Sequence, residues 1–319
     1  MPAAVETFAY TGQEPWHGLG TKVDGNLSAA EMLSAAQLDW EVGKFDTSFR
    51  VGKPGEKGNT TIKTGQQALV RLTDNKVLSP SVGPNWEPIQ NAQAFEFFHE
   101  FVESGKMTME TAGSLRDGRI VFGLAKVGED FELFGGDRVE SYLLFSNSHQ
   151  YGDTAKVDFT PIRVVCNNTL VMALSKKSSR AVTIDHRTAF DPARVKELMG
   201  IAHFKLDAYK QAAQHLGSKK ASKDDVIEYF KTVFPLAIKD PAEAKKEMSN
   251  NAKRAIEVLD AQPGAEFAEG TWWQAFNATT YMADHMLSKD ADTRLFNSWL
   301  GGVRDLKMKA MDLALQRAS

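Results

Sequence analysis

The sequence predicts an α+β fold, in which an antiparallel β-sheet packed with helices is followed by an all-helical C-terminal region. The first observation is a change of period: before Leu174 most apolar segments alternate as in strands, with two helical segments among them, whereas after it they recur with helical spacing. The second is the composition, since 42% hydrophobic and 25% charged residues are typical of a globular protein. We therefore expect a sheet domain over residues 1–175 and a helical region over residues 176–319.

The first 40 residues predict a loop and a short helix. The hexapeptide PWHGLG at 15–20 contains two glycines and an aromatic residue that we expect to pin a loop to the core. Ser28 precedes an apolar stripe, and Glu31 follows three residues later. This is the capping-box pattern, so a helix is expected to about Leu38.

The next segment predicts an antiparallel meander. Trp40–Val51 alternates like a half-buried strand, and KPGEKGN at 53–59 is a polar turn. Prolines at 80, 84 and 88 predict an irregular edge that lays Trp86 against the sheet. The further strands expected here are Thr60–Lys63, Ala68–Thr73 and Lys76–Leu78.

A helix and a hairpin should follow the meander. Asn91 is expected to cap the helix, Gly105 to end it, and its stripe of Ala94, Phe95, Phe98, Phe101 and Val102 to face the sheet. Asp117-Gly118 is a strong hairpin signal. The expected elements are a helix over Asn91–Glu103, strands over Thr108–Leu115 and Arg119–Val127, and a loop over Glu129–Asp137.

The stretch from Ser141 to Leu174 is expected to contain a strand, a polar loop, a second strand and the entry to a helix. A basic connector, SKKSSR, comes directly after it. Helices are then expected at roughly 191–216, 223–234, 241–261, 271–287 and 292–316.

Charge is unevenly distributed along the chain. Residues 1–160 contain 14 Lys and Arg against 22 Asp and Glu, whereas residues 161–319 contain 24 against 19. No apolar run reaches the roughly 18 residues of a membrane span, and no signal peptide is apparent. A single cysteine excludes an internal disulfide. We expect a soluble protein of the cytoplasm.

Two readings compete for the residues around the only cysteine. Cys166 would act as a nucleophile if a histidine such as His149 or His186 lowered its pKa, but free cysteines are more often inert core residues. Asn167, Asn168 and Thr169 resemble a helix cap; with Arg163 beside them, the same amides would accept an anion.

No metal or cofactor site is expected. The seven histidines include no HExxH and no His-x-His, and the nearest approaches are Asp185-His186 and His149 with Asp153. Walker A, GxGxxG and GxSxG sequences are absent.

Basic clusters remain as candidate contacts for nucleic acid. They are Lys176-Lys177 with Arg180, Lys219-Lys220 with Lys223, and Lys245-Lys246 with Lys253-Arg254. Trp272, Trp273 and Phe276 would offer stacking surfaces if exposed, although their helical spacing favours a core position.

Several motifs resemble a known family. They are PWHGLG at 15–20, NWEPIQNAQAFEFF at 85–98, AGSLRDGRIVF at 112–122, TPIRVVCNNTL at 160–170, TWWQAFNATTYMADH at 271–285 and FNSWLGG at 296–302. Together they are similar to the DUF932 family of phage- and plasmid-associated proteins of unknown function. The resemblance implies a mobile-element protein in the bacterial cytoplasm and brings no established catalytic residues.

We therefore expect a non-enzymatic, homo-oligomeric, nucleic-acid-associated protein that binds or anneals single-stranded DNA in recombination. The expected contact surface consists of Arg163, Asn167, Asn168, Lys176, Lys177 and Arg180, with phosphates met by cations and amides. The alternative is an accessory protein that binds and inhibits or scaffolds a host protein through its acidic half. A third hypothesis is an enzyme that uses Cys166.

Overall fold

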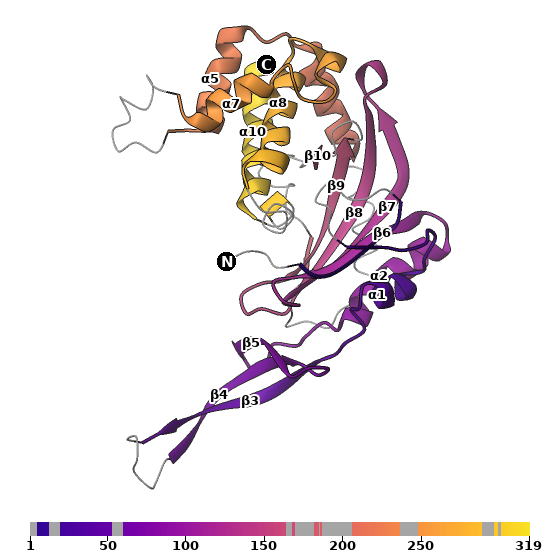
Figure 1. Ribbon diagram of the computed structural model, residues 1–319, viewed down its shortest axis with the longest axis vertical. Coiled ribbons are helices and arrows are strands. Elements are labelled where there is room, and N and C mark those ends of the chain that lie inside the picture. Colours follow the sequence, from indigo (N-terminus) through magenta and orange to yellow (C-terminus); the bar gives the residue numbers. More distant parts are fainter. Residues whose placement is uncertain are drawn as a thin grey trace.

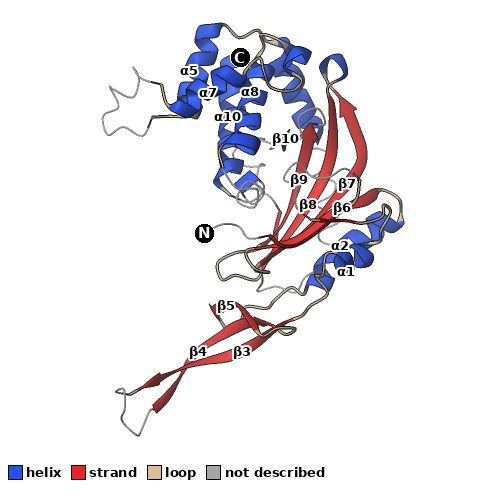
Figure 2. Cartoon of the chain, in the orientation of Figure 1, coloured by secondary structure: helices blue, strands red, loops and turns tan. Residues whose placement is uncertain are grey.

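The computed structural model describes residues 5–12, 20–52, 60–163, 168–169, 182–184, 186, 206–236, 248–288, 297–298 and 301–319. Strands fill the N-terminal two thirds, and mostly helices follow from residue 206 to the end (Figure 2). The predicted α+β class is therefore confirmed.

The larger of two sheets has eight described strands in the order β10-β9-β8-β7-β6-β1-β2, with β11 also on the outer edge of β9. Neighbours are antiparallel, except that β1 and β2 are parallel. The strands are β1 Val5–Tyr10, β2 Thr21–Lys22, β6 Met107–Leu115, β7 Ile120–Glu132, β8 Arg138–Ser148, β9 Ala155–Arg163, β10 Asn168–Thr169 and β11 Val182–Ile184.

The predicted β6–β7 hairpin is confirmed. Leu115 pairs with Ile120, and the turn residues Arg116, Asp117 and Gly118 all have positive φ. The loop expected at 129–137 is wrong in its first part, because β7 continues to Glu132. A register shift between Val127 and Phe131 accommodates the extra residues as a bulge, and only the 3₁₀ turn η1, Phe134–Gly136, follows.

Helices α1, Ala29–Ala35, and α2, Asn91–Glu103, pack together, and α2 lies on one face of the larger sheet (Figure 1). Both predicted helices are confirmed, and the Ser28–Glu31 capping box is present. The aromatic stripe of α2 contacts the sheet through rings such as Phe98, 6.4 Å from Phe145. The sheet's other face carries a second apolar cluster centred on Phe122.

Asn91 does not cap α2 as expected. The amide of Ala94 donates to the Gln90 carbonyl, so Gln90 holds the cap position. The buried Asn91 side chain instead donates from Nδ2 to the Leu38 carbonyl at 2.9 Å, while its Oδ1 lies 3.0 Å from His149 Nε2. Burial explains the difference, because an amide inside the core needs partners from several elements.

A separate three-stranded sheet contains β3 Val42–Val51, β4 Thr60–Arg71 and β5 Lys76–Val82. The antiparallel meander is confirmed, but the two strands expected within 60–73 are one strand, with an irregularity at Gly65. The irregular edge expected around Pro80 is present, since β5 is an edge strand with shifted register, but the strand extends beyond the expected Leu78 to Val82. β5 crosses Pro80 because its register with β4 shifts there, so no ladder hydrogen bond requires the missing N–H.

The tail contains a helix over residues 206–218, followed by helices α5, α7, α8 and α10. Asn168–Thr169 forms strand β10, so the helix entry expected there is wrong. The predicted helix over 241–261 is also wrong in extent, because Ser249 caps α7. The elements are α5 Lys223–Val233, α7 Asn250–Val258, η2 Ala265–Ala268, α8 Trp272–Tyr281, the π-turn η3 Met282–Met286 and α10 Gly302–Ala318.

The tail packs against the β7–β8 end of the larger sheet (Figure 1). Tyr209 contacts Phe131 edge to face, Trp273 Nε1 donates to Asp137 Oδ2 at 3.3 Å, and one buried cluster extends from α1 to α10.

The division into two domains at residues 175/176 stays a prediction. No helix in the described ranges is long and apolar enough to cross a membrane.

Candidate interaction arm

The predicted anion site lies mostly outside the described residues. Arg163 and Asn168 are opposite one another in the β9–β10 register, so the backbone brings these two together as expected. The other four members, Asn167, Lys176, Lys177 and Arg180, lie outside the described residues, as does Cys166. The site therefore stays a prediction.

A different surface stands out on the small sheet. This sheet, here called the arm and spanning residues 42–82, projects away from the larger sheet as a long β3–β4 ribbon with β5 at its base (Figure 1). Seven large apolar side chains are exposed in the described part of the chain, and only Tyr151 lies outside the small sheet and its turn. The other six, each 42–52% exposed, are Phe45, Phe49, Val51, Ile62, Leu72 and Val77.

The register places these side chains together. Phe49 pairs with Ile62, Phe45 with Ala68, and Val70 with Val77. Directly paired residues of antiparallel strands point to the same side of a sheet. One side of the small sheet therefore carries an apolar stripe, interrupted on β3 by Thr47, and we call this side the apolar face.

The opposite side of the arm, the polar face, carries the charges. Arg50 pairs with Thr61, Ser48 with Lys63, and Asp46 with Gln67. The Lys63 side chain is 83% exposed, and its Nζ lies 3.9 Å from Asp46 Oδ2. The arm is therefore amphipathic, yet the described structure leaves both of its faces in contact with solvent along the distal half.

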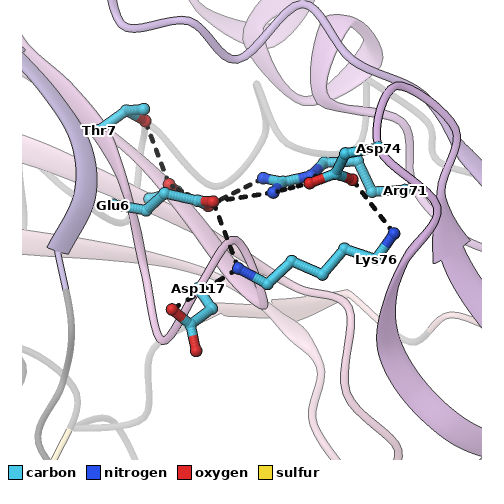
Figure 3. A network of polar contacts seen from close by, with 7 residues as sticks. Glu6, Thr7, Arg71, Asp74, Lys76 and Asp117 are labelled. Carbon is cyan, nitrogen blue, oxygen red and sulfur yellow. Dashed lines mark hydrogen bonds and ion pairs between the residues drawn. The ribbon is translucent and has the colours of Figure 1, made fainter.

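The base of the arm is tied to the larger sheet by a network of ion pairs (Figure 3). Arg71 donates from both terminal nitrogens to the Glu6 carboxylate, at 2.8 Å each, and from Nε to Asp74 Oδ1 at 2.9 Å. Lys76 Nζ lies 3.4 Å from Glu6 and 3.6 Å from Asp117. Because these residues belong to β1, β4, β5 and the β6–β7 turn, the network joins the two sheets.

The same contacts keep the carboxylates of the network charged. The hydrogen bonds from Arg71 lower the pKa of Glu6 and lower that of Asp74 to about 2. The Arg71 guanidinium also lies 5.2 Å from the centre of the Trp40 ring. Arg71 is only 7% exposed, so these interactions are shielded from solvent more than a surface pair would be.

Two further contacts hold the edge of β3. The Gln90 side chain accepts from the Val42 amide and donates to the Val42 carbonyl, both at 2.9 Å, as a neighbouring strand would. Lys44 Nζ lies 2.7 Å from Glu87. The base of the arm is thus fixed on two sides, while its distal half projects freely.

The histidines proposed as catalytic or metal-binding residues occupy structural positions where described. His149 is fully buried against the Trp40 ring, and burial lowers its pKa to about 3. Asp153, its expected companion, instead accepts from Ser148 Oγ at 3.0 Å. His186 stacks on Trp86 at 4.1 Å. Among the described residues, no three His, Cys, Asp or Glu side chains lie close enough together to hold a metal ion.

A buried ion pair in the tail also escaped sequence reasoning. Lys307 Nζ of α10 donates to Asp284 Oδ1 of η3 at 2.6 Å, and neither side chain is exposed to solvent. The helical period of α10 places Lys307 on the same face as Ala310 and Ala314. The position of Lys307 on this apolar face of α10 was the signal in the sequence that a buried charge lies here.

The alternation of Phe45, Phe49 and Val51 predicted a half-buried strand. The strand is confirmed, but its burial is not, because these three side chains are 50–52% exposed.

The tail aromatics proposed for base stacking are in the core. Trp272, Trp273 and Phe276 are all buried in α8. The alternative reading of their helical spacing is therefore the right one, and these rings offer no stacking surface.

Comparison with known families gave one match. A family model described as a domain of unknown function, DUF932, matches residues 77–310. Searches of curated proteins and of solved structures returned no match.

Proposed function

The chain belongs to the DUF932 family, whose domain has no assigned function, and we propose that it is a non-enzymatic nucleic-acid-associated protein of phage or plasmid origin. In this proposal it binds or anneals single-stranded DNA during recombination. The polar face of the arm meets the phosphates, together with the predicted site at Arg163, Asn167, Asn168, Lys176, Lys177 and Arg180.

The observation that carries this proposal is the charge of the arm. The segment from 42 to 82 contains seven Lys and Arg against three Asp and Glu, within a half of the chain that is acidic as a whole. At the base, Lys44, Arg71 and Lys76 are engaged in ion pairs. Arg50 lies on the exposed distal half, and Lys63 near it is 83% exposed, with its Nζ 3.9 Å from Asp46 Oδ2.

The projecting shape supports the same proposal. A two-stranded ribbon fits into the major groove of a duplex and can follow a single strand, and exposed cations on it would release counterions from phosphates. Affinity from such contacts depends on the surface presented, so the overall charge of −3 does not oppose it.

A salt titration of binding to single-stranded DNA tests the proposal. We expect binding at about 50 mM salt, with log K falling linearly as log salt rises. Arg50→Ala should reduce that slope by about 0.7, the contribution of one phosphate contact to a single strand. Lys309→Ala, which removes an exposed charge from α10, should leave it unchanged. Absence of binding, or a flat slope, would overturn the proposal.

The second candidate function is binding of a host protein through the acidic half. Outside the segment from 42 to 82, the first 160 residues contain only seven Lys and Arg against nineteen Asp and Glu. Such an excess favours a basic protein partner and repels nucleic acid. A pull-down from host lysate, with nuclease added, separates the two candidates, because only a protein partner survives the nuclease.

A further inference from the structure

We propose that the apolar face of the arm is an interface with a second copy of this chain, in which two arms pack face to face. The proposal concerns the side of the arm opposite Arg50 and Lys63, and it does not rest on nucleic-acid binding. Four observations support it: the exposure of the apolar side chains, the absence of charge on this face, the area of the face, and its shape.

The exposure is concentrated in one place. Six large apolar side chains, each about half exposed, lie on the small sheet and its turn, whereas such residues elsewhere in the described structure are buried or partly buried, apart from Tyr151. Contiguous apolar surface of this kind marks an interaction site in a globular protein. Isolated two-stranded ribbons are also only marginally stable, so a cover on this face would stabilise the arm.

The absence of charge favours a second copy over a charged partner. The residues that the register places on the apolar face include Phe45, Phe49, Ile62, Val70 and Val77, and the charged residues of β3 and β4 fall on the polar face. Two copies of this face therefore meet without like-charge repulsion. An acidic or basic partner would find its complementary charges on the opposite side of the arm.

The area is sufficient for a specific dimer. A phenylalanine side chain has roughly 200 Å² of surface, so a half-exposed one offers about 100 Å². Six comparable side chains give about 500 Å² per copy, and two copies give about 1,000 Å² before any backbone is counted. That total reaches the lower bound for a specific interface between proteins.

The shape of the stripe sets the arrangement. It extends along the strands from Val77 at the base of the arm to Val51 near its tip. Two stripes cover one another fully when the arms are antiparallel about a two-fold axis, with the tip of each over the base of the other. Because Arg71 and Gln90 fix the base of the arm, the surface is held in place before association and loses little freedom on binding.

The first test is the mass of the protein in solution, measured by sedimentation equilibrium over a range of concentrations. The unaltered chain should be a dimer, and Phe49→Glu, which places a charge in the stripe, should be monomeric. Ser48→Glu adds the same charge one residue away on the polar face and should remain dimeric. Ile62→Glu provides a second disruption, and far-UV circular dichroism shows whether each variant is folded.

The second test addresses the antiparallel arrangement by cross-linking. In a chain with Cys166→Ala, Val51→Cys and Val77→Cys are introduced separately, and the two proteins are mixed under oxidising conditions. Disulfides should form between the tip cysteine of one copy and the base cysteine of the other, and not between two tip cysteines.

Two results would overturn the inference. The first is a chain that is monomeric at every concentration, even if its arm binds a different protein. The second is a folded Phe49→Glu variant that stays dimeric. Cross-links between two tips would contradict the antiparallel geometry. A dimer that fails to bind DNA would leave this inference standing and remove only the proposed function, so the two failures are distinguishable.

Discussion

At the residue scale, the buried pair of Asp284 and Lys307 has the largest expected effect on stability. Both side chains lie fully inside the protein, and their charged atoms are 2.6 Å apart. Burial lowers the pKa of Lys307, and the Asp284 carboxylate opposes that shift. Each charge therefore stabilises the other, because neither side chain is exposed to water.

Removing one member of this pair should destabilise the protein strongly. We expect Lys307→Met to lower the free energy of unfolding by about 3–5 kcal/mol, as for other broken buried pairs. Lys231→Met removes the partner of Glu228 at the surface and should cost less than about 1 kcal/mol. Urea unfolding at neutral pH measures both. Similar losses in the two variants would show that the buried charge is not the cause.

The Glu6 carboxylate should make stability depend on pH. Its pKa is lowered in the folded state, mainly by the hydrogen bond from Arg71, and that of Asp74 is lowered to about 2. A lowered carboxyl pKa stabilises the fold above the unfolded-state value, and this stabilisation is lost as pH falls through the folded-state value. The network should therefore weaken between about pH 4.5 and pH 2.

Thermal unfolding across that range tests the effect. The Tm of the unaltered chain should fall as pH is lowered from 4.5, and Glu6→Gln should flatten part of that fall, since the variant has no proton to gain at this position. Parallel profiles for the two proteins would rule out Glu6 as a source of the acid sensitivity.

At the element scale, the close approach of α2 to β7 depends on one glycine. A Cβ atom on Gly123 would lie 3.0 Å from Phe98 and 3.2 Å from Phe95 of α2. The sheet thus leaves room for the aromatic stripe only where a side chain is absent. This contact sets the distance between the first helical layer and the sheet.

Gly123→Val should push α2 away from the sheet and cost about 1–3 kcal/mol in the free energy of unfolding, as overpacking does in other cores. Gly128→Val, on the same strand, is the matched control, since its nearest neighbour to a new Cβ is 3.9 Å away. Urea unfolding compares the two. Equal stability of both variants would mean that α2 can shift at no cost.

The sequence predicted the helices and turns that are marked by short patterns of neighbouring residues. Ser28 and Glu31 form the expected capping box, and Asp117-Gly118 turns the expected hairpin. The missed features required information from a partner strand: Pro80 fits within β5 only because of the shifted register with β4. Asn168 likewise joins β9 as a strand residue, although its type and context are those of a helix cap.

At the scale of the whole molecule, the two faces of the arm should respond oppositely to salt. Binding of phosphates by Arg50 weakens as salt rises, because the release of counterions into a more concentrated salt solution is less favourable in free energy. Burial of the apolar face involves no charges and is not screened. The same protein is therefore expected to lose DNA and keep its dimer at high salt.

Sedimentation equilibrium at about 50 mM and about 500 mM salt measures the second half of this expectation, over a range wide enough to screen surface charges. The dimer dissociation constant should be unchanged or lower at the higher concentration, while DNA affinity measured in the same buffers falls. Dissociation of the dimer at high salt would assign the contact to charges and would contradict an apolar interface.

The sequence by itself determined the α+β class, most helices and strands, the β6–β7 turn and the uneven distribution of charge. These follow from the periodicity of apolar residues and from contacts between residues close in the chain. Only the tertiary structure decided which apolar residues are covered. Phe49 and Phe122 both lie in strands that the sequence predicted, yet one is half exposed and the other is buried. Burial depends on what packs over a strand from distant parts of the chain, as Arg71 meets Glu6 across 65 residues, and no local pattern encodes that partner.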